Sequence, residues 1–264
     1  MPAPPHSDAP SAQTLRRGLG ILKLLARYQP EGLRISDIGR RLELTKATAV
    51  RLTQSLVDER FVVHDPVSRC YRLGPETFAI GLAAEPHYGL QRIASPLLRA
   101  LALETGDWTF FSVAQGFEVI CLSRETGDRP IPPDALKLGD RHPLGVGAGG
   151  VAVLAALPDD EVEVALRVNG RRIDAEFPNS PVHVIRSLLP PAREQGYAVI
   201  PGIVVPGYWA LGVPLRQTDG RPVAAIVVVA SESRLQPARR SALGQRLLAM
   251  SQEIMAQAAR GPVP

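Results

Sequence analysis

Residues 35–56 read ISDIGRRLELTKATAVRLTQSL, and this stretch decides the fold of the N-terminal part of the chain. It predicts two short helices joined by a tight turn. In the second helix Ala49, Leu52 and Leu56 recur at helical spacing, so they share one buried face. The polar and charged side chains then lie on other faces. This pattern is typical of a helix-turn-helix whose second helix enters the major groove of DNA.

The ends of these helices carry candidate caps and candidate DNA contacts. Thr45 can accept a hydrogen bond from the first turn of the second helix, and Ser36 is the candidate cap of the first. Arginine can bond a guanine edge or a phosphate, and valine can touch a thymine methyl. The candidates near the start of the second helix are Thr45, Lys46, Ala47, Thr48, Val50 and Arg51. The alternative is an ordinary helical hairpin with a solvated basic face.

A helix is predicted before this motif and a hairpin after it. The upstream apolar stripe consists of Leu15, Leu19, Leu22 and Ala26, and Ile21 and Leu25 widen it. Downstream, residues 61–64 and 70–73 predict two strands joined by a turn. Arg69 and Arg72 lie where a wing would reach the phosphate backbone. Residues 11–74 are therefore expected to form a winged helix-turn-helix domain, preceded by a disordered lead over residues 1–10.

Charge is concentrated in the same region. Residues 1–83 hold 12 Lys and Arg against 8 Asp and Glu, whereas the remainder holds 18 of each, so the whole formal excess of +4 lies in the first third. Such an excess attracts phosphate without regard to sequence. The N-terminus has no basic and apolar leader, and no apolar run approaches the ~20 residues of a membrane span, so a cytoplasmic protein without a membrane partner is expected.

Cysteine and histidine give no sign of a metal or redox site. Cys70 and Cys121 form no C-x-x-C motif and suit strand packing in a reducing compartment. The five histidines are scattered without ligand spacing. We therefore expect neither a metal nor a cofactor.

The remainder of the chain alternates helices with strands of period two. A linker over residues 75–89 includes a short helix at 75–84, and a helix over 90–103 is expected to be kinked or delayed by Pro96. Strands are predicted at 108–115, 117–124, 197–200, 208–215 and 222–230. Helices are predicted at 149–157, 159–168, 181–195 (with a possible break at Pro190 and Pro191) and 236–259. Helices around a mostly antiparallel sheet indicate an α+β domain over residues 90–260.

Several motifs, taken in order, resemble the IclR family of bacterial transcription regulators over nearly all of residues 14–260. They are K-x-T-x-x-R-L at residues 46–52, Y-x-L-G at 71–74, P-L-x-x-x-A-x-G-x-A-x-L-A at 143–155, and G-Y-A at 196–198 followed by P-G at 206–207. The resemblance implies a linker helix, a GAF-like effector-binding domain and a homodimer or dimer of dimers. It further implies a palindromic DNA operator and control by a small molecule.

The resemblance also implies where an effector would bind. A glycine-rich turn before a helix exposes backbone N–H groups that can seat a carboxylate, although a tight packing turn is the alternative. The expected contacts are Gly147, Ala148, Gly149, Gly150, Ile200, Ala210, Val227 and Val229.

This chain departs from the family pattern at several of these places. Ala210 stands where a cysteine is common, and Val227 and Val229 stand where hydroxyl residues occur. Glu43 occupies a turn position that usually holds glycine, at a cost of roughly 1 kcal/mol if φ is positive there. Two interpretations of the valines stay open. The effector is larger and more apolar, such as an aromatic acid, or the valines are core and ligand control is altered or lost.

Enzyme functions have less support. Residues 145–150 fit G-x-G-x-x-G, but no strand is predicted directly before them, and the acidic residues that follow at 159–163 open a predicted helix instead of ending a second strand. A hydrolase would need a nucleophile beside a base, and no G-x-S-x-G is present, so only Ser112, His142 and Asp140 could converge. The leading hypothesis is a sequence-specific DNA-binding regulator controlled by a small organic acid. The alternative is a ligand sensor that acts through protein contacts with a weak DNA-binding head.

Overall fold

The computed structural model describes residues 10–84, 89–129 and 136–260. The chain divides into two compact units, Met1–His87 and Tyr88–Pro264. The lead predicted for residues 1–10 lies outside the described residues except for Pro10, where the first helix already begins.

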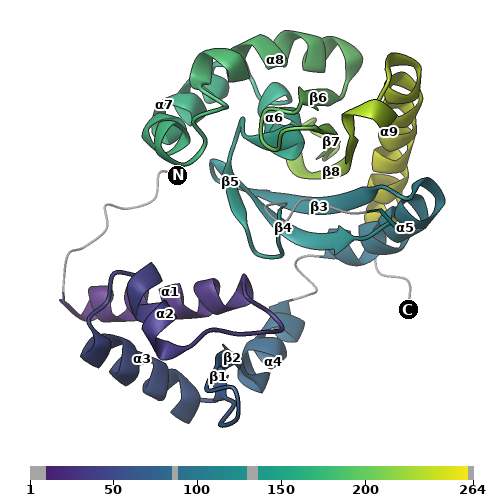
Figure 1. Ribbon diagram of the computed structural model, residues 1–264. Coiled ribbons are helices and arrows are strands. Elements are labelled where there is room, and N and C mark those ends of the chain that lie inside the picture. The colour runs from purple at the N-terminus through teal and green to yellow at the C-terminus, as the bar shows by residue number, and fades with distance from the viewer. Residues whose placement is uncertain (1–9, 85–88, 130–135, 261–264) are drawn as a thin grey trace. The chain divides into compact units, whose positions relative to one another are not determined.

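The N-terminal unit is a bundle of short helices with a two-stranded hairpin (Figure 1). Its elements are α1 (Pro10–Ala26), α2 (Ile35–Arg41), α3 (Lys46–Asp58), β1 (Val62–His64), β2 (Tyr71–Leu73) and α4 (Pro75–Ala84). Its core consists of Ile21, Leu25, Leu33, Ile38, Leu52 and Val62. Helices α1, α2 and α3 each bury apolar residues in this core, as amphipathic helices do when they enclose a small core.

Two local predictions in this unit are wrong in part. In α1, Leu15 and Leu19 are 64% and 46% exposed, whereas Ile21, Leu22 and Leu25 pack into the core as predicted. The cap of α2 is the backbone of Arg34, with no side-chain cap, and Ser36 lies inside the helix. The backbone carbonyl of Arg34 accepts from the N–H groups of Asp37 and Ile38, so the helix starts two residues earlier than a Ser36 cap would place it.

The C-terminal unit is a six-stranded antiparallel sheet in the order β5-β4-β3-β8-β7-β6 (Figure 1). The strands are β3 (Trp108–Gln115), β4 (Glu118–Glu125), β5 (Arg141–Pro143), β6 (Ala198–Pro201), β7 (Tyr208–Arg216) and β8 (Pro222–Ser231). The helices are α5 (Gly89–Thr105), α6 (Gly147–Ala155), α7 (Asp159–Glu176), α8 (Val182–Gln195) and α9 (Pro237–Ala259), with the 3-10 turn η2 (Glu232–Arg234).

The sheet has a core on each face. Helices α6, α7 and α8 cover one face over a core that includes Phe110, Cys121, Leu154 and Val227. Helices α5 and α9 cover the other over Phe111, Leu211 and neighbouring residues. Adjacent positions of β3 thus enter different cores, because side chains alternate across a strand. The predicted α+β architecture is confirmed.

Strand β5, directly before the glycine-rich turn, was not predicted, and several helices differ in extent or continuity from the prediction. Helix α6 begins at Gly147 instead of residue 149, and α7 runs to Glu176 instead of ending at 168. Helix α8 passes through Pro190 and Pro191 without a break. Both prolines are exposed, whereas Ile185, Leu189 and Ala192 pack into the core, so burial of the inner face maintains the helix. No helix in the described part of the chain is long and apolar enough to cross a bilayer.

Candidate functional site

Helix α3 is built as the sequence predicts. Thr45 is its N-cap, and the Thr45 hydroxyl oxygen accepts from the backbone N–H of Thr48 at 3.3 Å. Ala49 and Leu52 are buried beneath it. Gly39 of α2 lets the two helices approach, because a Cβ there would lie 3.3 Å from the Leu44 carbonyl oxygen and 3.7 Å from the Ala49 Cβ.

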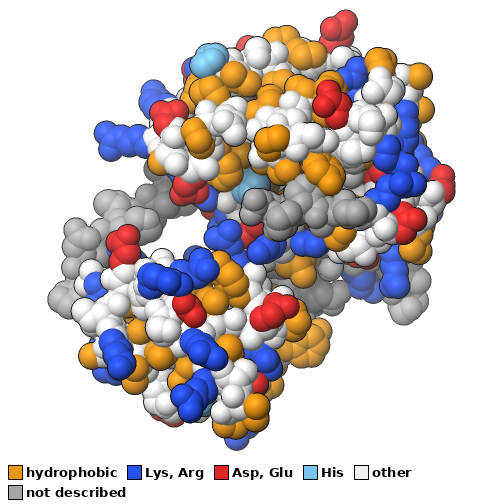
Figure 2. All heavy atoms as spheres, viewed as in Figure 1, with side chains coloured by type: hydrophobic (Ala, Val, Ile, Leu, Met, Phe, Trp, Pro, Cys, Tyr) orange, Lys and Arg blue, Asp and Glu red, His pale blue; other side chains and the backbone are white. Residues whose placement is uncertain are grey.

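The outer face of α3 presents most of the predicted DNA contacts to solvent. Thr45, Lys46, Ala47, Val50 and Arg51 are exposed, and only Thr48 is half-buried. Neither Lys46 nor Arg51 forms an ion pair with another described residue. Figure 2 shows Lys and Arg side chains distributed over the visible face of the N-terminal unit. Free cations on an exposed helix are suited to phosphate or to guanine edges.

The turn between α2 and α3 contains the strained position that the sequence indicated. Glu43 has φ of 52°, a left-handed conformation that favours glycine. Backbone hydrogen bonds of the turn offset this strain. In one of them the Leu44 N–H donates to the Gly39 carbonyl oxygen at 2.8 Å.

The two predicted wing arginines differ in their surroundings. Arg69 is exposed in the hairpin turn with φ of 58°. Arg72 is half-buried, with its guanidinium 3.6 Å from the Asp65 carboxylate, and it also donates to the Glu31 carbonyl oxygen at 3.4 Å. The hydrogen bond from the Ser68 hydroxyl is the main cause that lowers the pKa of Asp65, and the Val67 N–H and Arg72 lower it further. This carboxylate therefore stays charged and holds the turn. Arg69 is therefore the better placed of the two to reach a phosphate.

One buried polar atom of α3 has no hydrogen-bond partner among the described residues. The hydroxyl of Thr53 is fully buried and makes no hydrogen bond within the described part of the chain. Replacing Thr53 with valine keeps the shape and removes the unsatisfied hydroxyl, so we expect the N-terminal unit to gain about 1 kcal/mol of stability. The midpoint of urea unfolding would measure this gain. Thr53→Ala is the control and should lose stability, because it leaves a cavity. A lower midpoint for the valine variant would contradict the prediction.

In the C-terminal unit a cavity opens between the sheet and α6. The space between its lining atoms amounts to about 760 Å³ when the part open to solvent is included. All eight residues expected to contact an effector line it, namely Gly147, Ala148, Gly149, Gly150, Ile200, Ala210, Val227 and Val229. We refer to it as the central cavity.

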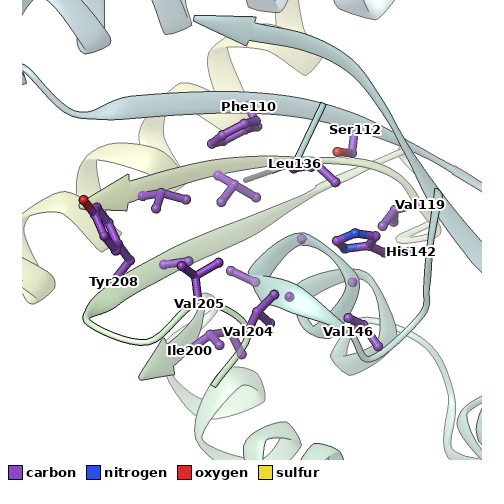
Figure 3. A pocket seen from close by; sticks show the side chains of 17 residues that line it. Phe110, Ser112, Val119, Leu136, His142, Val146, Ile200, Val204, Val205 and Tyr208 are labelled. Atoms are coloured by element: carbon purple, nitrogen blue, oxygen red, sulfur yellow. The ribbon is translucent and has the colours of Figure 1, made fainter. Parts of the chain in front are cut away.

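Nine further residues line the central cavity and were not predicted. They are Phe110, Ser112, Val119, Leu136, His142, Val146, Val204, Val205 and Tyr208. Figure 3 shows the Ser112 hydroxyl and the His142 ring at one end and Tyr208 at the other. These three are the only polar side chains in the described lining, which is otherwise apolar side chains and glycine backbone. The period-two pattern of β3 could have identified Phe110 and Ser112, since alternate residues share a face.

The first turn of α6 lies directly against the sheet. A Cβ on Gly212 of β7 would lie 2.3 Å from the Ala148 carbonyl oxygen, and one on Gly149 would lie 3.2 Å from a Val227 methyl. No side chain caps α6 at Val146. The N–H groups of this turn are thus available near the cavity wall, where a helix N-terminus favours a negative group.

Chemistry beyond binding has little support from these groups. Ser112 and His142 line the same cavity, but the Asp140 carboxylate accepts from the backbone N–H of Lys137 at 2.9 Å. Burial, above all, raises the pKa of the Cys121 thiol to about 12, so it stays protonated and unreactive. Among the described residues no group of three potential metal ligands occurs.

Family models match both units of the chain. The model described as IclR helix-turn-helix domain matches residues 14–66, and the model described as bacterial transcriptional regulator IclR C-terminal matches residues 84–256. The chain belongs to the IclR family of transcriptional regulators. It is a DNA-binding transcriptional regulator with a C-terminal effector-binding domain.

Relatives in the IclR family cover nearly the whole chain. The regulator BhcR of Paracoccus denitrificans is 28% identical over 94% of this chain and 88% of its own length. The repressor AllR of Klebsiella pneumoniae is 29% identical over 89% of this chain and 87% of its own length. The crystal structure of a regulator from Alicyclobacillus acidocaldarius superposes with a TM-score of 0.74 at 26% identity, over 92% of this chain and 98% of that chain.

Proposed function

We propose that this IclR-family regulator binds a palindromic operator as a homodimer and that an apolar organic acid in the central cavity changes its affinity for DNA. The observation that carries the proposal is the central cavity, whose described lining is apolar apart from three polar side chains and the uncapped turn of α6. Such a lining suits a small ligand with an apolar body and few polar atoms. Since the target is bacterial DNA, we place the protein in the cytoplasm.

The DNA part of the proposal rests on the exposed start of α3. Lys46, Thr48, Val50 and Arg51 would contact base edges or phosphates, and Arg69 of the wing would contact the backbone. Arg72 would contribute less because it already neutralises Asp65. The sequence-specific contacts of such a helix come from three or four side chains, which is the number that this face offers.

The effector part of the proposal favours an aromatic or branched acid over an acid of glyoxylate size. Val227, Val229 and Ala210 gain about 25 cal/mol for each Å² of apolar ligand surface that they bury. The N–H groups of Gly147 to Gly150 would receive a carboxylate or another acceptor. In support, an IclR homologue from Microbacterium hydrocarbonoxydans with this fold was crystallised with 4-hydroxybenzoate, at a TM-score of 0.72 and 22% identity over 92% of this chain and 98% of that chain.

The test of regulation uses the full chain and an operator selected from random duplex DNA. Aromatic acids and glyoxylate are compared by thermal shift and then by band shift on the selected operator. We expect the aromatic acids to raise the unfolding temperature more, and at least one to change operator affinity. Ligand binding without any DNA binding would instead support the sensor that acts through protein contacts.

The dimer part of the proposal rests on α4. From Phe78 to Ala84 this helix carries no polar side chain, and none of its residues is buried in the single chain. Phe78, Ile80 and Leu82 are 69%, 51% and 55% exposed. Leu15 and Leu19 of α1 are exposed in the same unit. A helix that is apolar on all sides is ordinarily covered, and a symmetric partner matches a palindromic site.

We expect Phe78→Asp to weaken dimerisation by about 2 kcal/mol, or roughly 30-fold, because an aromatic side chain that the proposed dimer buries becomes a charge. Light scattering over a concentration series would measure the change. Val168→Asp is the matched control, since Val168 is a single exposed apolar residue on α7. A monomeric wild-type protein, with and without operator DNA, would contradict the dimer.

A further inference from the structure

A second hollow lies where β3 and β7 begin and β8 ends. Its described lining includes Asp107, Trp108, Arg129, Tyr208, Val229 and Arg234. We call it the Trp108 hollow. Tyr208 and Val229 line both this hollow and the central cavity, so the two spaces share a wall.

Strand register shows that the Trp108 hollow continues the floor of the central cavity. Val227 pairs with Phe110, and Val229 pairs with both Trp108 and Ala210. Directly opposed residues of antiparallel strands point to the same face, and so do alternate residues along one strand. The side chains of Phe110 and Val227 in the central cavity are thus followed, on the same face, by Trp108 and Val229.

The two spaces differ in charge. No lysine or arginine is among the described residues that line the central cavity. The Trp108 hollow has Arg129 and Arg234, while the guanidinium of Arg124 stacks 4.5 Å from the Trp108 ring centroid. An anionic ligand would therefore find its charge partners in the hollow and its apolar contacts in the cavity.

The single carboxylate in the Trp108 hollow does not cancel this charge. Asp107 is 1% exposed and is shared by Arg234, at 3.0 Å, and by Arg239. Two guanidiniums against one carboxylate leave a positive excess beside the hollow. Arg129 adds to it, since its own partner, Asp128, is 4.0 Å away and 80% exposed. An exposed pair at that distance contributes little, which leaves Arg129 available.

We infer that the Trp108 hollow is a subsite of the central cavity and binds the anionic group of an elongated, amphipathic acid. The inference rests on the proposed effector function and specifies the shape and polarity of the ligand. The apolar body lies over Phe110 and Val227, and the anionic group reaches Arg129. Ser231 also lines the Trp108 hollow, and the four residues of strand from Val227 to Ser231 span about 13 Å, so a ligand that reaches from one space into the other is longer than a benzoate.

The opposite end of the cavity is suited to an uncharged polar group. A Cβ on Gly147 would lie 3.8 Å from Nδ1 of His142, so the first turn of α6 belongs to the His142 end. Ser112 lies at that end and Tyr208 at the other (Figure 3). A carbonyl or hydroxyl on the ligand would meet Ser112, His142 and the α6 amides, while the acid points the other way.

The test compares benzoate, phenylacetate and 4-phenylbutanoate with their primary amides, using calorimetry on the full chain. We expect the preference for acid over amide to grow with chain length and to reach about fivefold for 4-phenylbutanoate. Arg129→Gln should remove that preference while leaving amide affinity unchanged. Arg171→Gln, an exposed arginine on α7, is the matched control and should leave the preference intact.

Two outcomes overturn the inference in different ways. If the acids bind but their preference over the amides is the same for all lengths and survives Arg129→Gln, the carboxylate lies elsewhere in the cavity and the proposed effector function stands. If no compound binds, or if Val205→Trp and Ala210→Leu both fold and neither weakens binding, the central cavity is not the effector site. In that case the inference and the proposed effector site fail together.

Discussion

Replacing Arg51 with alanine is expected to weaken binding to the selected operator by about 1–3 kcal/mol, or roughly 5- to 150-fold. Arg51 is exposed on the outer face of α3, and its guanidinium pairs with no described residue. Its loss therefore leaves no buried partner unsatisfied, and folding should be unchanged. Band shift or fluorescence anisotropy on the operator would measure the effect.

The salt dependence of the variant separates two roles for Arg51. If the side chain reads a base edge, the loss is confined to the operator, and specificity relaxes at one base pair. If it neutralises a phosphate, every duplex loses affinity and the salt slope falls by about one. Arg17→Ala on the exposed side of α1 is the matched control. Unchanged affinity for every duplex would show that α3 is not the recognition helix.

Features of the helix-turn-helix that depend on neighbouring residues could be predicted from the sequence. The Thr45 cap and the left-handed Glu43 each involve residues within four positions along the chain. Such local chemistry is visible in a short window. The buried pair Ala49 and Leu52 likewise follows from helical spacing.

The inward face of α1 was predicted only in part, because the predicted stripe included residues that the structure leaves exposed. This helix carries apolar residues on more than one side, and the stripe through Leu15 and Leu19 has the same spacing as the one through Ile21 and Leu25. Periodicity gives the existence of a stripe, but partners distant in sequence decide which stripe is buried. The exposed stripe now contributes to the proposed dimer surface.

The residues predicted to contact an effector follow from resemblance to a family, and the structure brings those eight residues to one cavity. The cavity's other half comes from β3, β5 and the segment before β7, through residues such as Phe110, His142 and Val204. Their meeting depends on strand register and on loop paths. A single sequence does not specify either, because period two fixes the face of a strand and not its neighbour.

The charged residues beside the Trp108 hollow could be predicted from the sequence even less well. Asp107 is separated from Arg234 and Arg239 by 127 and 132 positions. Arginines are abundant in this chain, so nothing in composition singles out these two. A buried carboxylate needs partners, but only the fold shows which residues supply them.

The largest structural effect is expected from Gly212→Ala. A Cβ at this position would lie 2.3 Å from the Ala148 carbonyl oxygen and 2.5 Å from its carbonyl carbon. Both atoms belong to the backbone of α6, so no side chain can turn aside, and the helix has to move away from β7. Overpacking of this kind costs about 1–3 kcal/mol or more. Because α6 forms a wall of the central cavity, ligand binding should be lost together with stability.

The matched control is Gly170→Ala in α7, where an added methyl meets nothing within 4 Å. Alanine should stabilise that helix by up to about 1 kcal/mol, because glycine loses more backbone entropy on folding. Urea unfolding and calorimetry with 4-phenylbutanoate on both variants would measure the two effects. A glycine-to-alanine change would thus have opposite signs at the two sites, and only the one at Gly212 would alter the cavity. If Gly212→Ala unfolds at the wild-type midpoint and binds ligand normally, close contact between β7 and α6 does not shape the site.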